Sequence, residues 1–162
     1  MQQDWSKPVS SELIEAAKKG RWDVYITKKA ILESWLPKSI QGKDVLCLAS
    51  AGGQQAPILA AAGANVTVFD ISEKQLEQDL YVAKRNNLSL KTIQGDMCEL
   101  KGIGHSSFDY IIHPISNLYV SNLKPVWEEC YRVLRTKGIL LASFYNPILF
   151  VFDKNKEDER VL

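Results

Sequence analysis

The residues best placed to do chemistry are two acids and a cluster of very small residues. The cluster follows the apolar run 45–49 and leads into an Ala-rich helical segment. Asp70 ends a second apolar run, and Asp96 follows a third. Small residues let a ligand approach backbone N–H groups, and a carboxylate at a strand end can accept hydrogen bonds from a ribose diol. We therefore expect a nucleoside-containing ligand.

The spacing of the small residues narrows the type of nucleotide. A dinucleotide fingerprint GxGxxG would place glycines where the chain has Ala49, Ala51 and Gln54, and a GxxxxGK[ST] phosphate loop is absent. This pattern favours a nucleoside that carries something other than phosphate. Two alternatives stay open: the turn 49–53 serves only to pack helix against strand, and Asp96 caps a turn at 97–100. A nicotinamide-dependent oxidoreductase is a third, less favoured interpretation.

The elements that must position these residues alternate along the chain. We expect strands at 45–49, 66–69, 88–94, 108–113 and 139–145, separated by helices at 56–62, 73–85 and 125–134. Two further helices are expected at the N-terminal end, from Ser10 or Ser11 to Gly20 and over 22–36. Alternating strands and helices predict one α/β domain with a parallel sheet between two helical layers.

Composition excludes several classes of partner. The 162 residues carry 20 Lys+Arg against 19 Asp+Glu without basic clusters, so we expect no nucleic-acid partner. Three cysteines without CxxC spacing predict neither a zinc site nor a disulfide framework, and fit the cytoplasm. No metal is expected. The chain shows no apolar signal region and no stretch of membrane-spanning length, so we expect no membrane partner.

Five stretches in order resemble the class I S-adenosylmethionine-dependent methyltransferases. They are VLCLASAGGQQ, VTVFD, TIQGDM, FDYIIHPIS and VWEECYRVLRTKGILLASF. The resemblance implies a three-layer, Rossmann-like, doubly wound and mainly parallel sheet of about five strands in the order 3-2-1-4-5. It also implies S-adenosylmethionine as cofactor and methyl transfer as activity. The fourth stretch lacks the Asn/Asp-Pro-Pro-aromatic pattern linked to amines of bases or glutamine, so a small-molecule acceptor is expected.

The resemblance also assigns roles to residues. The turn 49–53 would face the methionine moiety and Asp70 would bind the ribose. Ile71 and Met97 would enclose adenine, and Asp96 would meet its amino group. Gln54 and Gln55 are candidates for polar contacts to the cofactor's carboxylate or amine. The full cofactor-binding set is Ala49, Ser50, Ala51, Gly52, Gly53, Gln54, Asp70, Ile71, Gly95, Asp96, Met97 and His113.

The chain departs from the family pattern at the first stretch. Cys47 stands where an acid is common, and Ala49 and Ala51 replace the first two glycines. Each added methyl group narrows the turn. Either the backbone avoids positive φ at these alanines or cofactor affinity is reduced.

The acceptor side has fewer markers. His113 would border the methyl group and could act as a general base, or its ring could merely pack at the strand end. Pro114 and Asn117 would lie near the acceptor. Trp22 or Tyr25 could fold over the pocket as part of a lid, or could cover one edge of the core.

We expect one domain with three segments: an N-terminal helical cap (1–37), the cofactor-binding core (38–147) and a tail (148–162). The family's C-terminal hairpin is missing, so the chain looks truncated, although 148–152 could supply part of a sixth strand. The strand at 139–145 would then be an exposed edge, which we expect a second copy of the chain or the tail to cover. A fragment that binds the cofactor without turnover is the alternative function.

Overall fold

The computed structural model describes residues 7–27 and 30–146. Five parallel strands form one sheet in the order β3-β2-β1-β4-β5, as the sequence predicts. The strands are β1 (Asp44–Leu48), β2 (Asn65–Asp70), β3 (Lys91–Gln94), β4 (Phe108–His113) and β5 (Leu134–Ala142). The helices are α1 (Ser11–Lys18), α2 (Gln55–Ala61), α3 (Glu73–Arg85) and α4 (Lys124–Val133), with single 3₁₀ turns at Glu33–Trp35 and Ser116–Tyr119.

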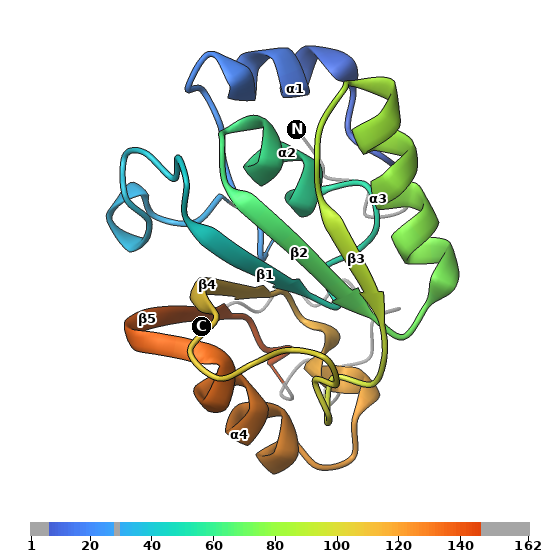
Figure 1. The fold of residues 1–162 in the computed structure, drawn as a ribbon, viewed down its shortest axis with the longest axis vertical. Helices are drawn as coiled ribbons and strands as arrows, with labels where there is room; N and C mark the ends of the chain where they lie inside the picture. The colour runs from blue at the N-terminus through green and yellow to red at the C-terminus, as the bar shows by residue number, and fades with distance from the viewer. Residues whose placement is uncertain (1–6, 28–29, 147–162) are drawn as a thin grey trace, which may run out of the picture.

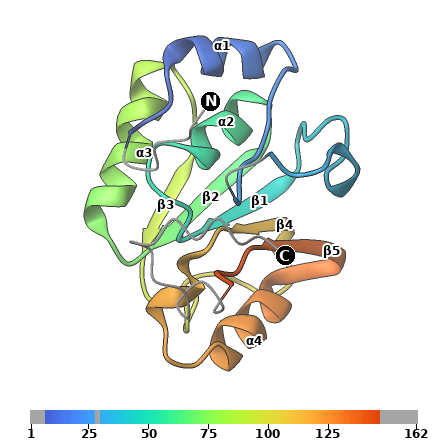
Figure 2. The same ribbon diagram turned by 180° about the vertical axis from the view of Figure 1, so that it is seen from behind.

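Helices cover both faces of the sheet. Figures 1 and 2 show α1, α2 and α3 on one side and α4 on the other. Successive side chains of a strand point to opposite faces. Accordingly Val45 and Cys47 of β1 pack in the core beneath α2, whereas Leu46 and Leu48 pack in the core beneath α4. A strand buried on both faces must be apolar at every position, which explains the unbroken apolar run in the sequence.

The N-terminal segment contains one helix rather than two. Ser10 caps α1 by accepting a hydrogen bond from the Leu13 amide, as expected. The helix expected over 22–36 is wrong: the described part of this stretch has a bridge between Tyr25 and Ala30 and the 3₁₀ turn. Its β-branched residues favour extended backbone, and the amide of Tyr25 donates to the Gln55 side chain instead of to a helical carbonyl.

The fifth strand begins earlier than the sequence suggests. Leu134 starts β5 directly after α4, and the pairing with β4 then skips from Leu134 to Ile139. Among the described residues β5 pairs only with β4, and Ile139 is 40% exposed. The expected cover from a second copy or the tail stays a prediction, and the sixth-strand segment 148–152 lies outside the described residues.

The turn between β1 and α2 uses left-handed backbone at two alanines. Ala49 has φ 47° and Ala51 has φ 62°, so the backbone does not avoid positive φ where the family carries glycine. A Cβ atom in this region crowds the following carbonyl. The turn is therefore built with local strain at these two alanines.

Two side chains of α3 hold the next two residues of this turn. The Gly52 amide donates to Gln75 Oε1 at 2.5 Å, and the Gly53 amide donates to Asp79 Oδ1 at 2.7 Å. A Cβ at Gly52 would lie 2.1 Å from the Gln75 carbonyl oxygen, so only glycine allows this approach. We call these two hydrogen bonds the α3 clamp.

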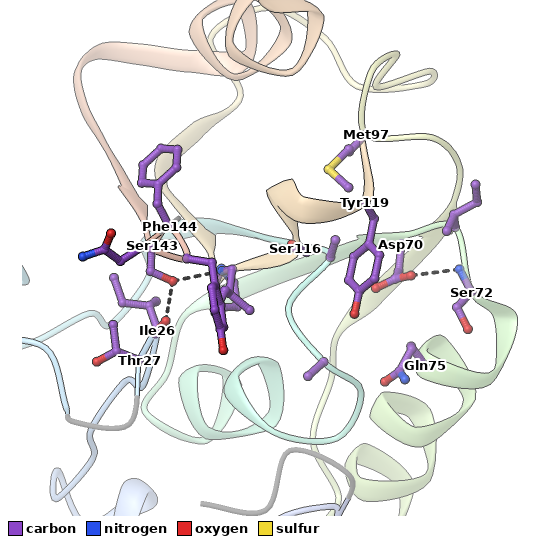
Figure 3. Close-up of a pocket in the computed structure, with 17 residues that line it drawn as sticks. Ile26, Thr27, Asp70, Ser72, Gln75, Met97, Ser116, Tyr119, Ser143 and Phe144 are labelled. Atoms are coloured by element: carbon purple, nitrogen blue, oxygen red, sulfur yellow. Dashed lines mark hydrogen bonds between the residues drawn. The ribbon is translucent and has the colours of Figure 1, made fainter. Parts of the chain in front are cut away.

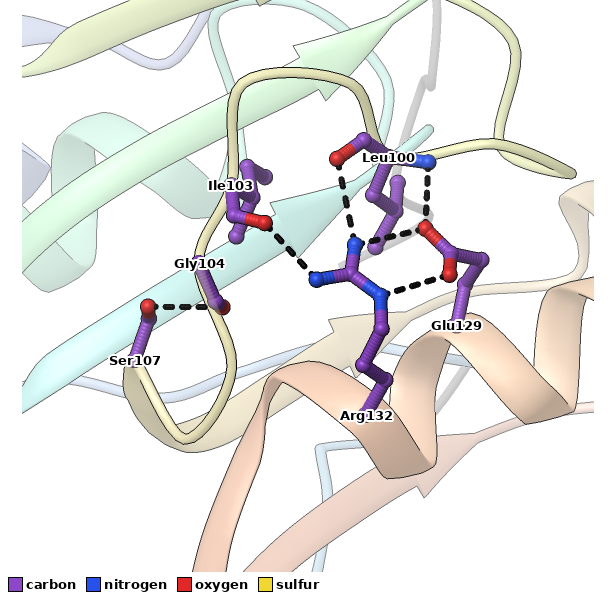
Figure 4. A network of polar contacts seen from close by, with 6 residues as sticks. All are labelled: Leu100, Ile103, Gly104, Ser107, Glu129 and Arg132. Atoms are coloured by element: carbon purple, nitrogen blue, oxygen red, sulfur yellow. Dashed lines mark hydrogen bonds and ion pairs between the residues drawn. The ribbon is translucent and has the colours of Figure 1, made fainter.

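A second polar network fixes the segment after β3 (Figure 4). Arg132 of α4 donates to both carboxylate oxygens of Glu129, each at 2.7 Å, and to the Ile103 carbonyl at 2.8 Å. Glu129 also accepts from the Leu100 amide at 2.7 Å. This ion pair connects the segment after β3 to α4, and each of its half-buried charges has a partner of opposite sign. No helix in the described part of the chain is long and apolar enough to cross a membrane.

The strain at Ala51 gives a first prediction. Ala51→Gly should raise the free energy of unfolding by roughly 0.5–1 kcal/mol, because relieving left-handed strain of about 1–2 kcal/mol outweighs the added entropy of the unfolded chain, about 0.4–1 kcal/mol. Urea unfolding followed by circular dichroism measures the change. The control Ala16→Gly, within α1, should lower stability by about 1 kcal/mol. A loss of stability in both variants would contradict the strain.

The clamp gives a second prediction. Burial and, to a lesser extent, the nearby Asp70 raise the pKa of Asp79 to about 7, although the hydrogen bond from the Gly53 amide opposes the shift. The folded state therefore holds this proton more tightly than the unfolded state does. The stabilisation is complete below about pH 4 and is lost as the pH rises through 7.

Asp79→Asn removes that titration but keeps an oxygen for the Gly53 amide. From pH 5 to pH 8 the wild-type chain should lose roughly 2–3 kcal/mol of stability relative to the variant. Urea unfolding at both pH values measures it. Glu77→Gln, an exposed change on the same helix, should keep the wild-type pH dependence. Equal pH dependence in wild type and Asp79→Asn would refute the assignment.

Candidate functional site

A cavity of about 840 Å³ opens at the carboxyl ends of the strands, where ligands of open parallel sheets bind. Its walls come from the ends of β1, β2, β4 and β5, from the segment after β3 and from the N-terminal segment (Figure 3). The lining residues are Ile26, Thr27, Ala49, Ala51, Asp70, Ile71, Ser72, Gln75, Met97, Pro114, Ile115, Ser116, Tyr119, Ser143, Phe144, Tyr145 and Asn146.

Among the residues that the structure describes, Asp70 is the only one lining the cavity that has a carboxylic acid or a basic side chain. It is 8% exposed, and its Oδ1 accepts from the Ser72 amide at 2.8 Å. Burial raises the pKa of this carboxyl, and hydrogen bonds from the amides of Ser72 and Ile71 offset part of the shift. The site thus presents one partly buried acceptor group at the end of β2.

Several predicted residues meet at this cavity. Ala49, Ala51 and Asp70 line it together with Ile71 and Met97, and Pro114 does so on the acceptor side. These residues come from the ends of β1, β2 and β4 and from the segment after β3. The sheet topology therefore joins the first four sequence motifs in one place.

The remaining small residues of the turn face the protein. The amides of Gly52 and Gly53 are held by the α3 clamp. Ser50 is 1% exposed, and the Gln54 side chain donates to the Lys7 carbonyl at 3.1 Å. None of these four residues lines the cavity. In this structure their first role is to shape the turn that presents Ala49 and Ala51.

Asp96 and Gly95 have structural contacts. Asp96 is exposed and its Oδ1 accepts from the Cys98 amide at 2.8 Å, as in the turn-capping interpretation. A Cβ at Gly95 would lie 2.4 Å from the Phe69 ring, so this glycine allows close packing. The Gly95 amide donates to the Asp70 carbonyl, which brings the ends of β2 and β3 together. Neither Gly95 nor Asp96 lines the cavity.

His113 is fully buried and does not line the cavity. Its Nδ1 lies 3.0 Å from the Leu48 carbonyl oxygen, which can only accept, so Nδ1 carries a proton. Burial lowers the pKa of the ring, so it is neutral at pH 7. Its edge packs against Trp127, with ring centroids 5.7 Å apart. This geometry matches the packing interpretation of His113.

The N-terminal segment reaches the cavity through different residues from those expected. Trp22 packs against the core and the Tyr25 amide bonds Gln55, whereas Ile26 and Thr27 line the cavity. Asn117 is buried and donates to the Ser143 carbonyl at 2.6 Å. Trp22, Tyr25 and Asn117 are not among the lining residues.

Sequence reasoning missed the lining residues that follow β4 and β5, chiefly Ile115, Ser116, Ser143 and Phe144. The signal was present, because ligands in open parallel sheets lie beyond the carboxyl ends of the strands. The rule covers the residues after β4 and after its neighbour β5 as well as those after β1 and β2. Gln75 and Ser72 were missed because they belong to the helix that faces the turn.

The cavity fits the nucleoside part of the expected cofactor. It offers a carboxylate for a diol at Asp70 and apolar surfaces at Met97 and Ile71, of which Ile71 is 67% exposed. Pocket volumes of about 300–1,000 Å³ are usual for ligands of drug size. No group of three or more His, Cys, Asp or Glu within residues 7–27 and 30–146 could hold a metal ion.

Comparisons with known proteins agree with this geometry. Residues 46–142, more than half of the chain, match a family described as "Methyltransferase domain". The chain is 50% identical to the uncharacterized methyltransferase YbaJ of Bacillus subtilis over 160 residues, which are 98% of this chain and 62% of YbaJ. It is 30% identical to a sterol 24-C-methyltransferase of Pneumocystis carinii over 119 residues, covering 72% of this chain and 30% of that protein.

A solved structure shows the same fold. The PH0226 protein of Pyrococcus horikoshii aligns with a TM-score of 0.58 and 29% identity, over 63% of this chain and 49% of that protein. The chain thus spans less than two thirds of the length of each of these relatives. From the sheet order, the cavity and the matched residues, the chain belongs to the class I S-adenosylmethionine-dependent methyltransferases, whose cofactor is S-adenosylmethionine.

Proposed function

We propose that this chain binds S-adenosylmethionine in the cavity and transfers its methyl group to a small-molecule acceptor. The observation that carries the proposal is the position of Asp70. It is the single charged lining group in the described cavity, and it lies at the end of β2 beside a turn of very small residues. A carboxylate there can bind both hydroxyl groups of a ribose.

The residues around Asp70 would hold the nucleoside. Ile71 and Met97 present apolar surface for the two faces of adenine, and Asp96 follows β3, the neighbour of β2. One oxygen of Asp96 is used by the Cys98 amide. A carboxylate has several acceptor sites, so Asp96 can also accept from the adenine amino group.

The chemistry requires little from the protein beyond alignment. Bound S-adenosylmethionine supplies an electrophilic methyl group on a sulfonium. The chain's residues bind, orient and exclude water, and proximity alone can contribute several kcal/mol, roughly 7–11 in the best intramolecular cases. We assign no base to His113, because the ring is buried, neutral and turned toward Leu48 and Trp127.

A small-molecule acceptor is supported by the concave shape of the site and by the balanced charge of the chain. The chain has 20 basic and 19 acidic residues, whereas a nucleic-acid-binding protein usually carries an excess of basic residues on one surface. One relative is named as a sterol 24-C-methyltransferase, and a sterol is a small, mostly apolar molecule. The buried thiols of Cys47 and Cys130 are free, and we propose a reducing cytoplasm for the protein.

A second candidate is cofactor binding without turnover. It is favoured by the length comparison, because the chain covers only 62% of YbaJ and substrate pockets in this fold are often completed by C-terminal segments. Both candidates require the cofactor to bind. A binding measurement therefore tests the shared step without needing the acceptor.

Isothermal titration calorimetry with S-adenosylhomocysteine tests the proposal. The wild-type chain should bind, and Asp70→Asn should weaken binding at least about tenfold, because a hydrogen bond to a charged group contributes about 1.5–3 kcal/mol. Asparagine keeps an oxygen for the Ser72 amide, so the loop should hold its shape. Glu77→Gln, an exposed change on α3, is the matched control and should bind as wild type.

Two results would reject the proposal. The first is no heat of binding at millimolar S-adenosylhomocysteine, and the second is equal affinity for wild type and Asp70→Asn. Titration of NAD under the same conditions should show no binding. Tight NAD binding that depends on Asp70 would favour the oxidoreductase instead.

A further inference from the structure

The cavity is chemically asymmetric. Figure 3 shows Asp70, Ser72 and Gln75 on one side and Ile26, Ser143 and Phe144 on the other. We call the second side the Phe144 end, defined by Ile26, Pro114, Ile115, Ser143 and Phe144. It lies beyond β4 and β5, whereas the nucleoside is assigned to the ends of β2 and β3.

The polar groups of Ser143 at the Phe144 end are used inside the protein. The Ser143 hydroxyl donates to the Ile26 carbonyl and accepts from the Ile115 amide at 2.9 Å. The Ser143 carbonyl accepts from Asn117 Nδ2 at 2.6 Å, and its amide donates to the His113 carbonyl at 3.3 Å. Ser143 thus ties three chain segments together with all its hydrogen-bonding groups. What the defining residues offer a ligand is mostly aliphatic and aromatic surface.

The apolar side chains of this end remain accessible. Phe144 is 60% exposed and Ile115 is 39% exposed, although both are large apolar residues. The Phe144 ring is held in place against Trp127, with centroids 5.9 Å apart. Exposed apolar surface inside a cavity costs free energy until a ligand covers it, and it marks binding sites.

Ile115 adds evidence of a built site. Its φ is 38°, in the left-handed region that a β-branched residue rarely adopts. The hydrogen bond from its amide to Ser143 holds it there. Backbone strain of this kind, roughly 1–3 kcal/mol, tends to cluster at ligand sites, where the surrounding structure maintains it.

Charge narrows the ligand further. The residues that define the Phe144 end include no cation and no anion. A charged ligand group placed there would lose hydration without gaining a partner, which is unfavourable. An uncharged apolar ligand gains free energy in proportion to the area it removes from water.

We propose that the Phe144 end is the acceptor subsite and that it takes an uncharged, predominantly apolar small molecule. The assignment of this end to the acceptor rests on the proposed function. The preference for an uncharged, apolar ligand rests only on the residues of the Phe144 end. The apolar body of the ligand packs on Phe144, Ile115 and Ile26. The cofactor's nucleoside binds separately at Asp70.

Two matched probes test the preference. N-phenyl-1-naphthylamine is uncharged, and 1-anilinonaphthalene-8-sulfonate has the same rings with one added sulfonate. In fluorescence titrations, with and without S-adenosylhomocysteine, the wild-type chain should bind the uncharged probe at least tenfold more tightly. Equal or tighter binding of the sulfonate would overturn the charge preference.

Variants test the location. Phe144→Ser and Ile115→Asn should each weaken binding of the uncharged probe about tenfold, and asparagine tolerates the left-handed backbone of position 115. Tyr131→Ser is the matched control, because Tyr131 is 86% exposed on α4 and outside the cavity. Unchanged affinity in both cavity variants, or an equal loss in Tyr131→Ser, would overturn the subsite.

Calorimetry keeps this inference separate from the proposed function. Phe144→Ser should bind S-adenosylhomocysteine within about twofold of wild type, whereas Asp70→Asn should bind that ligand at least about tenfold more weakly and keep its affinity for the uncharged probe. If S-adenosylhomocysteine does not bind to the wild-type chain, the proposed function is rejected. Binding of the uncharged probe still tests the apolar subsite in that case. If both ligands depend on the same residue, the division of the cavity is wrong.

Discussion

The hydrogen bonds from Gly52 and Gly53 to Gln75 and Asp79 are the constraint on which the site depends. They join the turn after β1 to the helix after β2, so one pair of contacts sets the distance between the two βα units. Close approach requires that Gly52 lack a Cβ. The amides of Gly52 and Gly53 are bonded to the protein, and the residues of this region that line the cavity are Ala49, Ala51 and Asp70.

The clamp also explains how the family pattern tolerates its substitutions here. An isolated turn would not keep positive φ at Ala49 and Ala51, because alanine disfavours this backbone conformation. Anchoring Gly52 and Gly53 immediately after these alanines over-determines the backbone, so the strain is held. Asp79 is buried with one carboxylate oxygen lacking a partner among the described atoms, and its proton makes that burial less costly.

The two ends of the cavity differ in their chemistry. In the proposed function Asp70 accepts hydrogen bonds from the ribose diol, and the Phe144 end supplies apolar surface for the acceptor. His113 and Ser143 both make hydrogen bonds that hold the cavity wall in place. His113 connects β4 to β1. Ser143 connects the end of β5 to the loop after β4 and to the N-terminal segment. Polar residues near the expected reaction centre therefore position the wall that an acceptor would meet.

The sequence by itself determined the alternation of strands and helices and the places of Asp70 and the turn at strand ends, because apolar periodicity and strand-end residues are local patterns. The strand order and the family followed from the resemblance of five sequence stretches, and Ile71 and Met97, which that resemblance assigns to adenine, line the cavity. Only the tertiary structure decided which atoms are free: the amides of Gly52 and Gly53 and the ring of His113 bond partners that are far away in the sequence. One oxygen of Asp96 is taken by a local partner, the Cys98 amide. Tertiary contacts also turned the stretch after Trp22 from an expected helix into extended chain, which brought Ile26 to the cavity.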